Sequence, residues 1–211
     1  MARAAASGLA AGADGRRRCW WALSTPEYVS YHDEEWGRPV TSDEALFERL
    51  TLEAFQSGLS WLTILRKREG FRRAFAGFEI ARVSEFGAAD VERLLDDASI
   101  VRNRAKIEAA IANARAVSQT VEDEGSLAAL VWSFAPPRRR APRTRGDIPA
   151  TTPESTALAR ELRRRGFRFL GPTTVYATMQ ACGVVNDHLG GCLVRAEVET
   201  ERAAAKRALA G

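Results

Sequence analysis

The chain has few cysteines and histidines and no long apolar run. It has two histidines and three cysteines. Three cysteines argue against a disulfide framework, which leaves metal binding or simple burial as their role. No apolar stretch approaches the roughly 18 residues that a membrane-spanning helix needs. The apolar stretch within residues 1–18 is interrupted by glycines and Asp14, and it has almost no bulky apolar side chains. We therefore expect a disordered N-terminal extension, not a signal peptide, and a cytoplasmic location.

Motifs for several common reactions are absent as well. The sequence contains no GxxxxGK or GxGxxG stretch for phosphate or dinucleotide binding, and no GxSxG motif. If both histidines bind a metal, a Ser–His or Cys–His nucleophile is excluded too. The chain does have 45% hydrophobic residues and a net charge of +4. These values suit one domain with a real core, and they permit a nucleic-acid partner without requiring one.

Helical periodicity dominates the chain, and alternating strand patterns are scarce. Thr41 and Glu44 have the spacing of a capping box at the start of one helix. Ser60 can cap a second helix, and Thr152 followed by Pro153 can start another. Apolar residues recur at helical spacing after each of these starts. We predict an all-α protein without internal repeats.

Both histidines of the chain lie near a cysteine. Cys19 precedes His32, and His188 precedes Cys192. Two thiolates and two imidazoles suit a closed tetrahedral zinc site, which would join the two ends of the chain. The alternative is that these residues are simply buried, because their spacing is not that of a standard zinc finger. Cys182 lies in an apolar helical pattern and is expected in the core.

Residues 96–107 predict two helices joined by a tight turn. Free amides in such a turn, together with a helix N-terminus, can bind a DNA phosphate. The positive charges of Arg102, Arg104 and Lys106 add to this. The alternative is an ordinary helical hairpin with solvated arginines.

A third candidate is Glu53, late in the first strong helix. It lies on the solvated face, or it faces a pocket together with Trp61, Tyr28 and Tyr31. In the second case it completes an aromatic box suited to a flat, positively charged heterocycle. Spacing alone does not bring these segments together.

Long stretches of the chain resemble the 3-methyladenine-DNA glycosylase I (Tag) family. They include CWW…PEYVSYHDEEWG, LFERLTLEAFQSGLSWLTILRKRE, DVERLLDDASIVRNRAKIEAAIANARA and RRRGFRFLGPTTVYATMQACGVVNDH. The resemblance covers residues 19–192. It implies the helix-hairpin-helix DNA glycosylase fold, with two helical lobes around a base pocket in residues 19–195 and a loosely ordered tail at 196–211.

The implied activity is hydrolysis of the N-glycosidic bond of 3-methyladenine in alkylated double-stranded DNA. The base would flip out of the helix and leave as free 3-methyladenine, without lyase cleavage of the strand. The resemblance also implies a structural zinc ion. A monomer is the default expectation.

The resemblance also implies roles for particular residues. The zinc ligands would be Cys19, His32, His188 and Cys192. Glu53 would be the catalytic candidate, pairing with the base together with Tyr31. Trp61 would stack on the base, Trp21 and Tyr28 would line the walls, and Leu59 would wedge into the DNA. The DNA-backbone contacts would come from the predicted turn and the helix that follows it: Ser99, Arg102, Arg104 and Lys106.

Two features depart from the family pattern. Ser99 stands where the family usually has a glycine, which eases close approach of the backbone to a phosphate. The loop from Arg138 to Arg145 holds five arginines, and it is either a disordered solvated loop or a source of extra non-specific DNA affinity. The acidic run 33–35 is expected to be solvated or capping, and Trp36 to be core.

Overall fold

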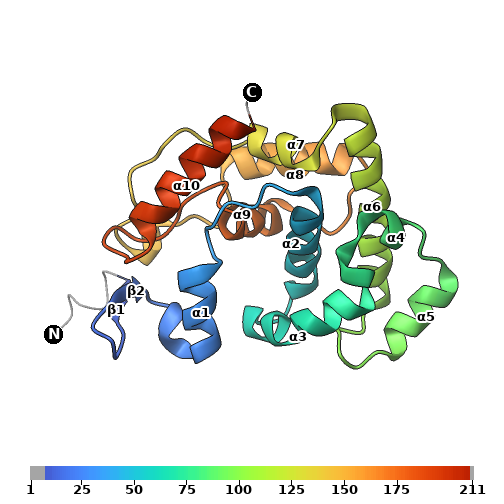
Figure 1. Cartoon of the computed structure of the whole chain (residues 1–211), viewed down its shortest axis with the longest axis horizontal. Helices are drawn as coiled ribbons and strands as arrows, with labels where there is room; N and C mark the ends of the chain where they lie inside the picture. Colours follow the sequence, from blue (N-terminus) through green and yellow to red (C-terminus); the bar gives the residue numbers. More distant parts are fainter. Residues whose placement is uncertain (1–7, 210–211) are drawn as a thin grey trace.

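A computed structural model describes residues 8–209 and has a mostly helical chain with one short sheet (Figure 1). The α-helices are α1 Pro26–Glu34, α2 Asp43–Gln56, α3 Trp61–Ala74, α4 Ile80–Ser84, α5 Ala88–Asp96, α6 Arg104–Glu124, α7 Leu127–Ser133, α8 Pro153–Arg164, α9 Pro172–Ala181 and α10 Arg195–Ala208. Short 3-10 helices are η1 Ala22–Ser24, η2 Ala76–Phe78 and η3 Arg145–Asp147, and the strands are β1 Leu9–Ala11 and β2 Arg17–Cys19. The predicted helical class is confirmed, with this sheet as the exception.

The helices begin close to the predicted caps. Ser60 and Thr152 cap α3 and α8 as expected. α2 begins one residue later than predicted, because Ser42 and not Thr41 is its N-cap, and the Ser42 hydroxyl accepts a hydrogen bond from the Ala45 amide. Thr41 and Ser42 both carry a hydroxyl group that can cap a helix, so the sequence alone did not show which of the two is the N-cap.

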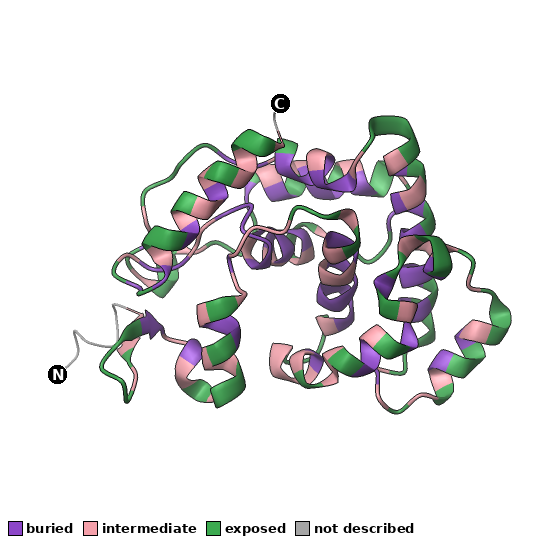
Figure 2. Ribbon diagram, in the orientation of Figure 1, coloured by how far each residue is buried: buried purple, intermediate pink, exposed green. Residues whose placement is uncertain are grey.

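α2 and α9 lie at the centre of the molecule. They pack against each other, α9 also packs on α8, and α2 packs on α6. β1, β2 and α1 lie on one side of this pair and α4, α5 and α6 on the other (Figure 1). Buried residues follow the central helices (Figure 2), and five buried phenylalanines link α2, α3 and η2: Phe47, Phe55, Phe71, Phe75 and Phe78. Burying each ring contributes roughly 1.5–3 kcal/mol to folding.

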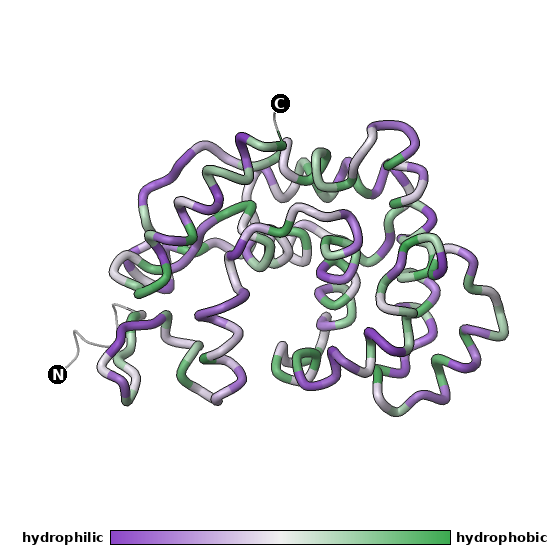
Figure 3. The backbone as a smooth tube through the Cα atoms, viewed as in Figure 1, coloured by the Kyte–Doolittle hydropathy of each residue, from purple (hydrophilic) through white to green (hydrophobic). Residues whose placement is uncertain are grey.

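Hydropathy alternates along the helices instead of forming long apolar blocks (Figure 3). No helix among residues 8–209 is both long and apolar enough to cross a membrane.

Residues 8–18 differ from the expected disordered extension. β1 and β2 pair antiparallel with Leu9 opposite Cys19. Arg18 is buried, and its guanidinium donates hydrogen bonds to Asp14 and Asp33. A buried guanidinium is tolerated only when it is paired, so this pair of carboxylates fixes the hairpin. Residues 1–7 of the predicted extension lie outside the described residues.

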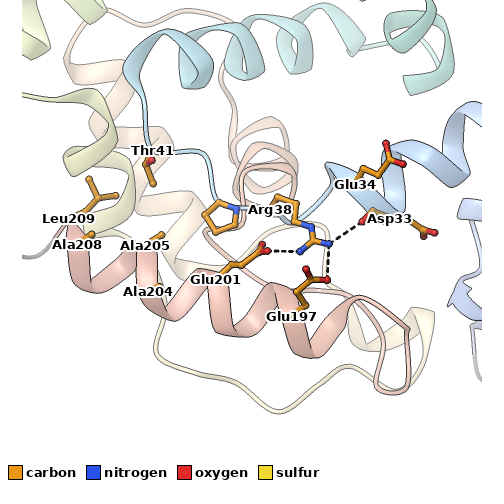
Figure 4. Close-up of a pocket in the computed structure, with 11 residues that line it drawn as sticks. Asp33, Glu34, Arg38, Thr41, Glu197, Glu201, Ala204, Ala205, Ala208 and Leu209 are labelled. Atoms are coloured by element: carbon orange, nitrogen blue, oxygen red, sulfur yellow. Dashed lines mark hydrogen bonds and ion pairs between the residues drawn. The ribbon is translucent and has the colours of Figure 1, made fainter.

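The predicted loose tail is a packed helix, α10, through residue 208. Arg38, in the segment between α1 and α2, donates to Glu197 at 3.0 Å, to Glu201 at 2.6 Å and to the backbone oxygen of Asp33 at 3.2 Å (Figure 4). Val198 is fully buried on the inner face of α10. These contacts make α10 part of the same packed body.

Candidate functional site

A cavity of about 660 Å³ opens among α1, α2, α3 and α9. Half of its lining residues are aromatic and one carries a carboxyl group; the lining consists of Trp20, Trp21, Ser24, Tyr28, Tyr31, Trp36, Glu53, Gln56, Trp61, Ile148, Ala177 and Gln180. A larger groove of about 960 Å³ follows α10, but charged pairs and alanines line it and it has no aromatic side chain (Figure 4). Small flat ligands bind in apolar cavities with a few placed polar groups, so the aromatic cavity is the candidate site.

The predicted base-binding residues meet in this cavity. The rings of Tyr31 and Trp61 lie 5.4 Å apart, and those of Trp21 and Tyr28 lie 5.7 Å apart, edge to face. The Tyr28 hydroxyl accepts a hydrogen bond of 3.0 Å from the Leu62 amide in the first turn of α3. That bond joins α1 to α3 and holds two walls of the cavity together.

Glu53 lies in the cavity with only 6% of its surface exposed. Its carboxyl group has no hydrogen-bonding partner among residues 8–209. Burial raises its pKa to about 8, against a smaller opposing effect of the positive charge of Arg49. Burial and the neighbouring Glu53 also raise the pKa of the Tyr31 hydroxyl. The cavity thus holds an acid that a bound cation can convert to its charged form.

Arg49, whose positive charge acts on Glu53, belongs to a group of ion pairs between α2 and α3. Arg49 precedes Glu53 by four residues in α2, so both lie on the same side of the helix. The Arg49 guanidinium donates to Glu35 at 2.9 Å, and Arg68 of α3 donates to Glu35 at 2.5 Å. The Arg49 Nη1 atom is buried without a hydrogen-bonding partner among the described residues. Glu35 is therefore an ion-pair centre between α2 and α3, and it is also the C-cap residue of α1. Of the two roles expected for it, capping is confirmed and solvation is not.

The four predicted metal ligands form one buried cluster. The donor atoms of Cys19, His32, His188 and Cys192 all lie within 4.8 Å of one another. Cys192 Sγ lies 3.4 Å from His32 Nε2 and 3.6 Å from His188 Nδ1, and Cys19 Sγ lies 3.8 Å from His188 Nδ1. Adjacent S and N ligands of a tetrahedral zinc ion are about 3.5 Å apart, given the usual bond lengths. The cluster therefore fits a four-coordinate metal ion.

The second ring nitrogen of each histidine in the cluster also lies at hydrogen-bonding distance from an oxygen atom. His32 Nδ1 lies 2.7 Å from Asp33 Oδ1, and His188 Nε2 lies 2.9 Å from the Trp36 carbonyl oxygen. Metal-binding histidines usually make such a second contact, which fixes the tautomer and the ring plane. Because Arg18 pairs with Asp33 in turn, the expectation that Asp33 is solvated or capping is wrong.

Aromatic rings connect the cluster to the cavity. Trp21 packs on His32 with ring centroids 5.1 Å apart, and Trp36 packs on His188 at 4.6 Å. Both tryptophans also line the cavity. Trp36, predicted as core, is thus a shared wall between the metal cluster and the cavity.

The predicted DNA-backbone residues separate into two groups. Ser99 and Arg102 lie in the turn between α5 and α6, with Arg102 exposed. Arg104 pairs with Glu92 at 2.7 Å. Lys106 is buried, and its ammonium group donates to the carbonyl oxygens at the end of α2. This placement does not fit the phosphate contact predicted for Lys106, because the amine already satisfies buried carbonyl groups.

The carbonyls that Lys106 binds belong to the segment that carries the predicted wedge. They are those of Phe55 and Ser57, just before Leu59, which is 41% exposed. Gly58 has a φ of +83°, a conformation that favours glycine. Lys106 therefore fixes the α2–α3 loop and with it the position of Leu59.

Sequence reasoning missed several residues of the site. Arg49 gave a signal in its i, i+4 spacing to Glu53, and Asp33 in its position beside His32. Trp20 and Ile148 gave none, because their place in the cavity wall comes from tertiary packing.

The fold and the cavity define a class of protein: a helical domain with an aromatic pocket for a small flat ligand, beside a closed Cys/His site that can hold a metal ion. A family model described as methyladenine glycosylase matches residues 21–196. The chain belongs to the methyladenine glycosylase family.

Two relatives and two solved structures support this assignment. The DNA-3-methyladenine glycosylase 1 of Escherichia coli (strain K12) is 46% identical over 177 residues, which are 83% of this chain and 95% of the relative. The DNA-3-methyladenine glycosylase of Haemophilus influenzae is 39% identical over 178 residues, 83% of this chain and 96% of that relative. A crystal structure of 3-methyladenine DNA glycosylase I matches with a TM-score of 0.81 at 47% identity, covering 83% of this chain and 98% of that one. A Staphylococcus aureus structure on 3-methyladenine recognition matches with a TM-score of 0.80 at 35% identity, covering 83% and 94%.

The burial of Glu53 predicts an unusual pH dependence of stability. Its pKa of about 8 lies above the ordinary value of 4.5, so its contribution to stability is complete below about pH 4.5 and is lost as the pH rises through 8. The free energy of unfolding of Glu53→Gln, measured relative to the wild type, should therefore be roughly 2–4 kcal/mol higher at pH 9 than at pH 5. Urea unfolding at both pH values measures this difference.

Glu35→Gln is the matched control for this prediction. Arg68 and Arg49 lower the pKa of Glu35 to about 2, against burial, which alone would raise it. Its stabilising contribution is present above pH 4.5, so the variant should be less stable at both pH values. A pH-independent gain for Glu53→Gln would contradict a buried, ionisable Glu53.

The turn between α5 and α6 predicts a second stability effect. A Cβ on Gly70 of α3 would lie 2.5 Å from the Ser99 carbonyl oxygen. Gly70→Ala should therefore destabilise the protein by about 1–2 kcal/mol, although alanine favours a helix by about 1 kcal/mol. Gly146→Ala should change stability little, because the nearest atom to its Cβ would be the Thr144 hydroxyl oxygen, 3.7 Å away. Equal urea midpoints for the two variants would contradict the close packing of Gly70 in α3 against Ser99 in the α5–α6 turn.

Proposed function

We propose that this protein removes 3-methyladenine from alkylated DNA by hydrolysing the N-glycosidic bond, the first step of base excision repair. One observation carries the proposal: a single buried carboxyl group, Glu53, lies in a cavity of about 660 Å³ with six aromatic residues in its lining. The relatives named as DNA-3-methyladenine glycosylases support the choice of substrate.

The target base must leave the DNA stack to reach this cavity. Flipping costs a few kcal/mol, and stacking on aromatic rings offsets part of it. In our proposal Trp61 stacks on the base, and Trp21 and Tyr28 form the walls. Leu59, exposed in the α2–α3 loop, fills the gap in the DNA as apolar wedges do. The turn between α5 and α6 then contacts the phosphate backbone of the duplex through Ser99, Arg102 and Arg104.

Charge gives the selectivity in this proposal. 3-Methyladenine in DNA is a cation, whereas adenine is neutral. Ionising a buried Glu53 with a pKa of about 8 costs on the order of 1 kcal/mol at pH 7, and only a cationic ligand compensates for that cost. Glu53 and the Tyr31 hydroxyl then pair with the edge of the alkylated base.

The chemical step needs little help from the protein. The cationic base takes the electron pair of the cleaved bond and leaves neutral, so it needs no protonation. Water adds to the anomeric carbon of the sugar and loses a proton. Glu53 is the candidate catalytic residue, because its carboxylate stabilises positive charge on the base and on the developing oxocarbenium ion.

We propose further that the enzyme does not cleave the strand. A lyase needs an amine nucleophile that forms a Schiff base. The three lysines of the chain are Lys67, Lys106 and Lys206. The amine of each donates to backbone carbonyl oxygens, and none lines the cavity.

The cluster of Cys19, His32, His188 and Cys192 is proposed to hold a structural zinc ion. Four protein ligands leave no open position, so the ion would supply cross-linking and not water activation. The cluster joins β2 and α1 to the segment before α10. The helix-hairpin-helix superfamily, the cytoplasmic location and the monomeric state stay predictions.

Base release tests the proposed activity. Methylated duplex DNA incubated with the protein should yield free 3-methyladenine, detected by chromatography. Glu53→Gln should slow release at least about tenfold, the usual loss when a charge-stabilising group is removed, while binding to undamaged DNA stays similar. Glu48→Gln is the control on the same helix, because Glu48 pairs with Arg72 outside the cavity.

Two outcomes would overturn the assignment. Normal release by Glu53→Gln would remove Glu53 from the site. Binding of methylated DNA without any base release would instead indicate a damage sensor with no enzymatic activity.

Metal analysis tests the zinc site. The purified protein should hold about one zinc per chain, as a closed four-ligand site predicts. Cys192→Ser should lose the metal and several degrees of Tm, because metal binding contributes to folding. Cys182→Ala, at a buried cysteine outside the cluster, should keep its zinc. Metal-free wild-type protein with unchanged Tm would refute a structural role.

A further inference from the structure

The arginine-rich loop between α7 and α8 forms part of the cavity wall. Ile148, just after η3, lines the cavity. The guanidinium of Arg145 lies 5.5 Å from the ring centroid of Trp20, which lines the same cavity. The loop therefore reaches the mouth of the site and is not confined to a distant surface.

Hydrogen bonds hold this loop in place. Asp147 Oδ2 accepts bonds from the amides of Arg143 at 2.7 Å and Thr144 at 2.8 Å. The Gly190 amide donates to the Pro142 carbonyl oxygen at 2.7 Å. Gly190 lies between the two C-terminal members of the metal cluster, so the loop is fixed to that cluster. This arrangement disfavours the disordered solvated loop considered from the sequence.

The arginines of the loop differ in their partners. Arg139 pairs with Glu154 at 2.6 Å, and Arg138 lies 4.0 Å from Glu199. Arg145 is exposed and has no carboxylate within 4.0 Å among residues 8–209. An aromatic face positions a guanidinium without neutralising its charge. Arg145 is thus an oriented and uncompensated cation at the cavity mouth.

We propose that Arg145 binds a backbone phosphate of the damaged DNA strand, next to the nucleotide whose base enters the cavity. A flipped nucleotide keeps its phosphates at the rim of the pocket, and a guanidinium matches phosphate geometry with two parallel hydrogen bonds. The turn between α5 and α6 lies on the other side of the central helices (Figure 1). The strand is then held from two sides. This inference rests on the proposed glycosylase function.

Salt titration of DNA binding tests the contact. Each neutralised phosphate contributes about 0.9 to the slope of log K against log salt. Arg145→Gln should lower the magnitude of that slope by about one and weaken binding of a duplex with one abasic site, which imitates the flipped nucleotide after base release, roughly five- to tenfold at 0.1 M salt. Arg138→Gln removes the same charge from the same loop, at a side chain that is 84% exposed and beside Glu199, and should leave the slope unchanged.

A second measurement separates phosphate binding from support of Trp20. The affinity of Arg145→Gln for free 3-methyladenine should equal that of the wild type, and Arg145→Lys should restore part of the salt slope. Lost affinity for the free base would show that Arg145 only holds the cavity wall, which overturns the proposal. Equal slope losses for Arg138→Gln and Arg145→Gln would overturn it as well, because net charge alone would explain them.

The two proposals can fail separately. Wild-type protein that releases no base from methylated DNA overturns the proposed function and this inference together. Wild-type protein that releases base, with the full salt slope retained by Arg145→Gln, overturns the Arg145 contact alone.

Discussion

The cluster of Cys19, His32, His188 and Cys192 is the constraint on which the site depends. It joins two parts of the chain that are about 160 residues apart in sequence. Trp21 and Trp36 pack on its histidines and also line the cavity. Any shift in the cluster would therefore move two walls of the site. A metal ion held there acts on function by keeping aromatic rings in place.

The cavity combines this rigid wall with a poorly solvated acid. Glu53 has no hydrogen-bonding partner among the described residues, and burial raises its pKa to about 8. Arg49, held by Glu35, moderates the shift, so the acid stays within reach of ionisation at neutral pH. A neutral ligand does not offset the free-energy cost of ionising Glu53, whereas a cationic ligand does. The same burial that destabilises the free protein therefore favours an alkylated base.

Much of the fold and part of the site could be predicted from the sequence. Helical periodicity, the caps at Ser60 and Thr152 and the buried Cys182 follow from local patterns, because caps and periodicity act over a few residues. The resemblance then identified the cluster and the cavity residues, and the structure brings both sets together. Local reasoning was wrong for residues 8–18 and α10. Their order comes from distant ion pairs of Arg18 and Arg38, and sequence spacing does not encode such pairs.

By itself, the sequence determined the donor chemistry: two thiols, two imidazoles, one acid among aromatics and a surplus of arginine. Only the tertiary structure decided how each group is used. Lys106 and Arg102 look alike in the sequence, yet Lys106 satisfies buried carbonyl groups and Arg102 faces solvent. Arg138 and Arg145 belong to one loop, yet only Arg145 stacks on a wall of the cavity. The reason is physical: the charge a residue presents depends on its burial and partners, and these come from distant parts of the chain.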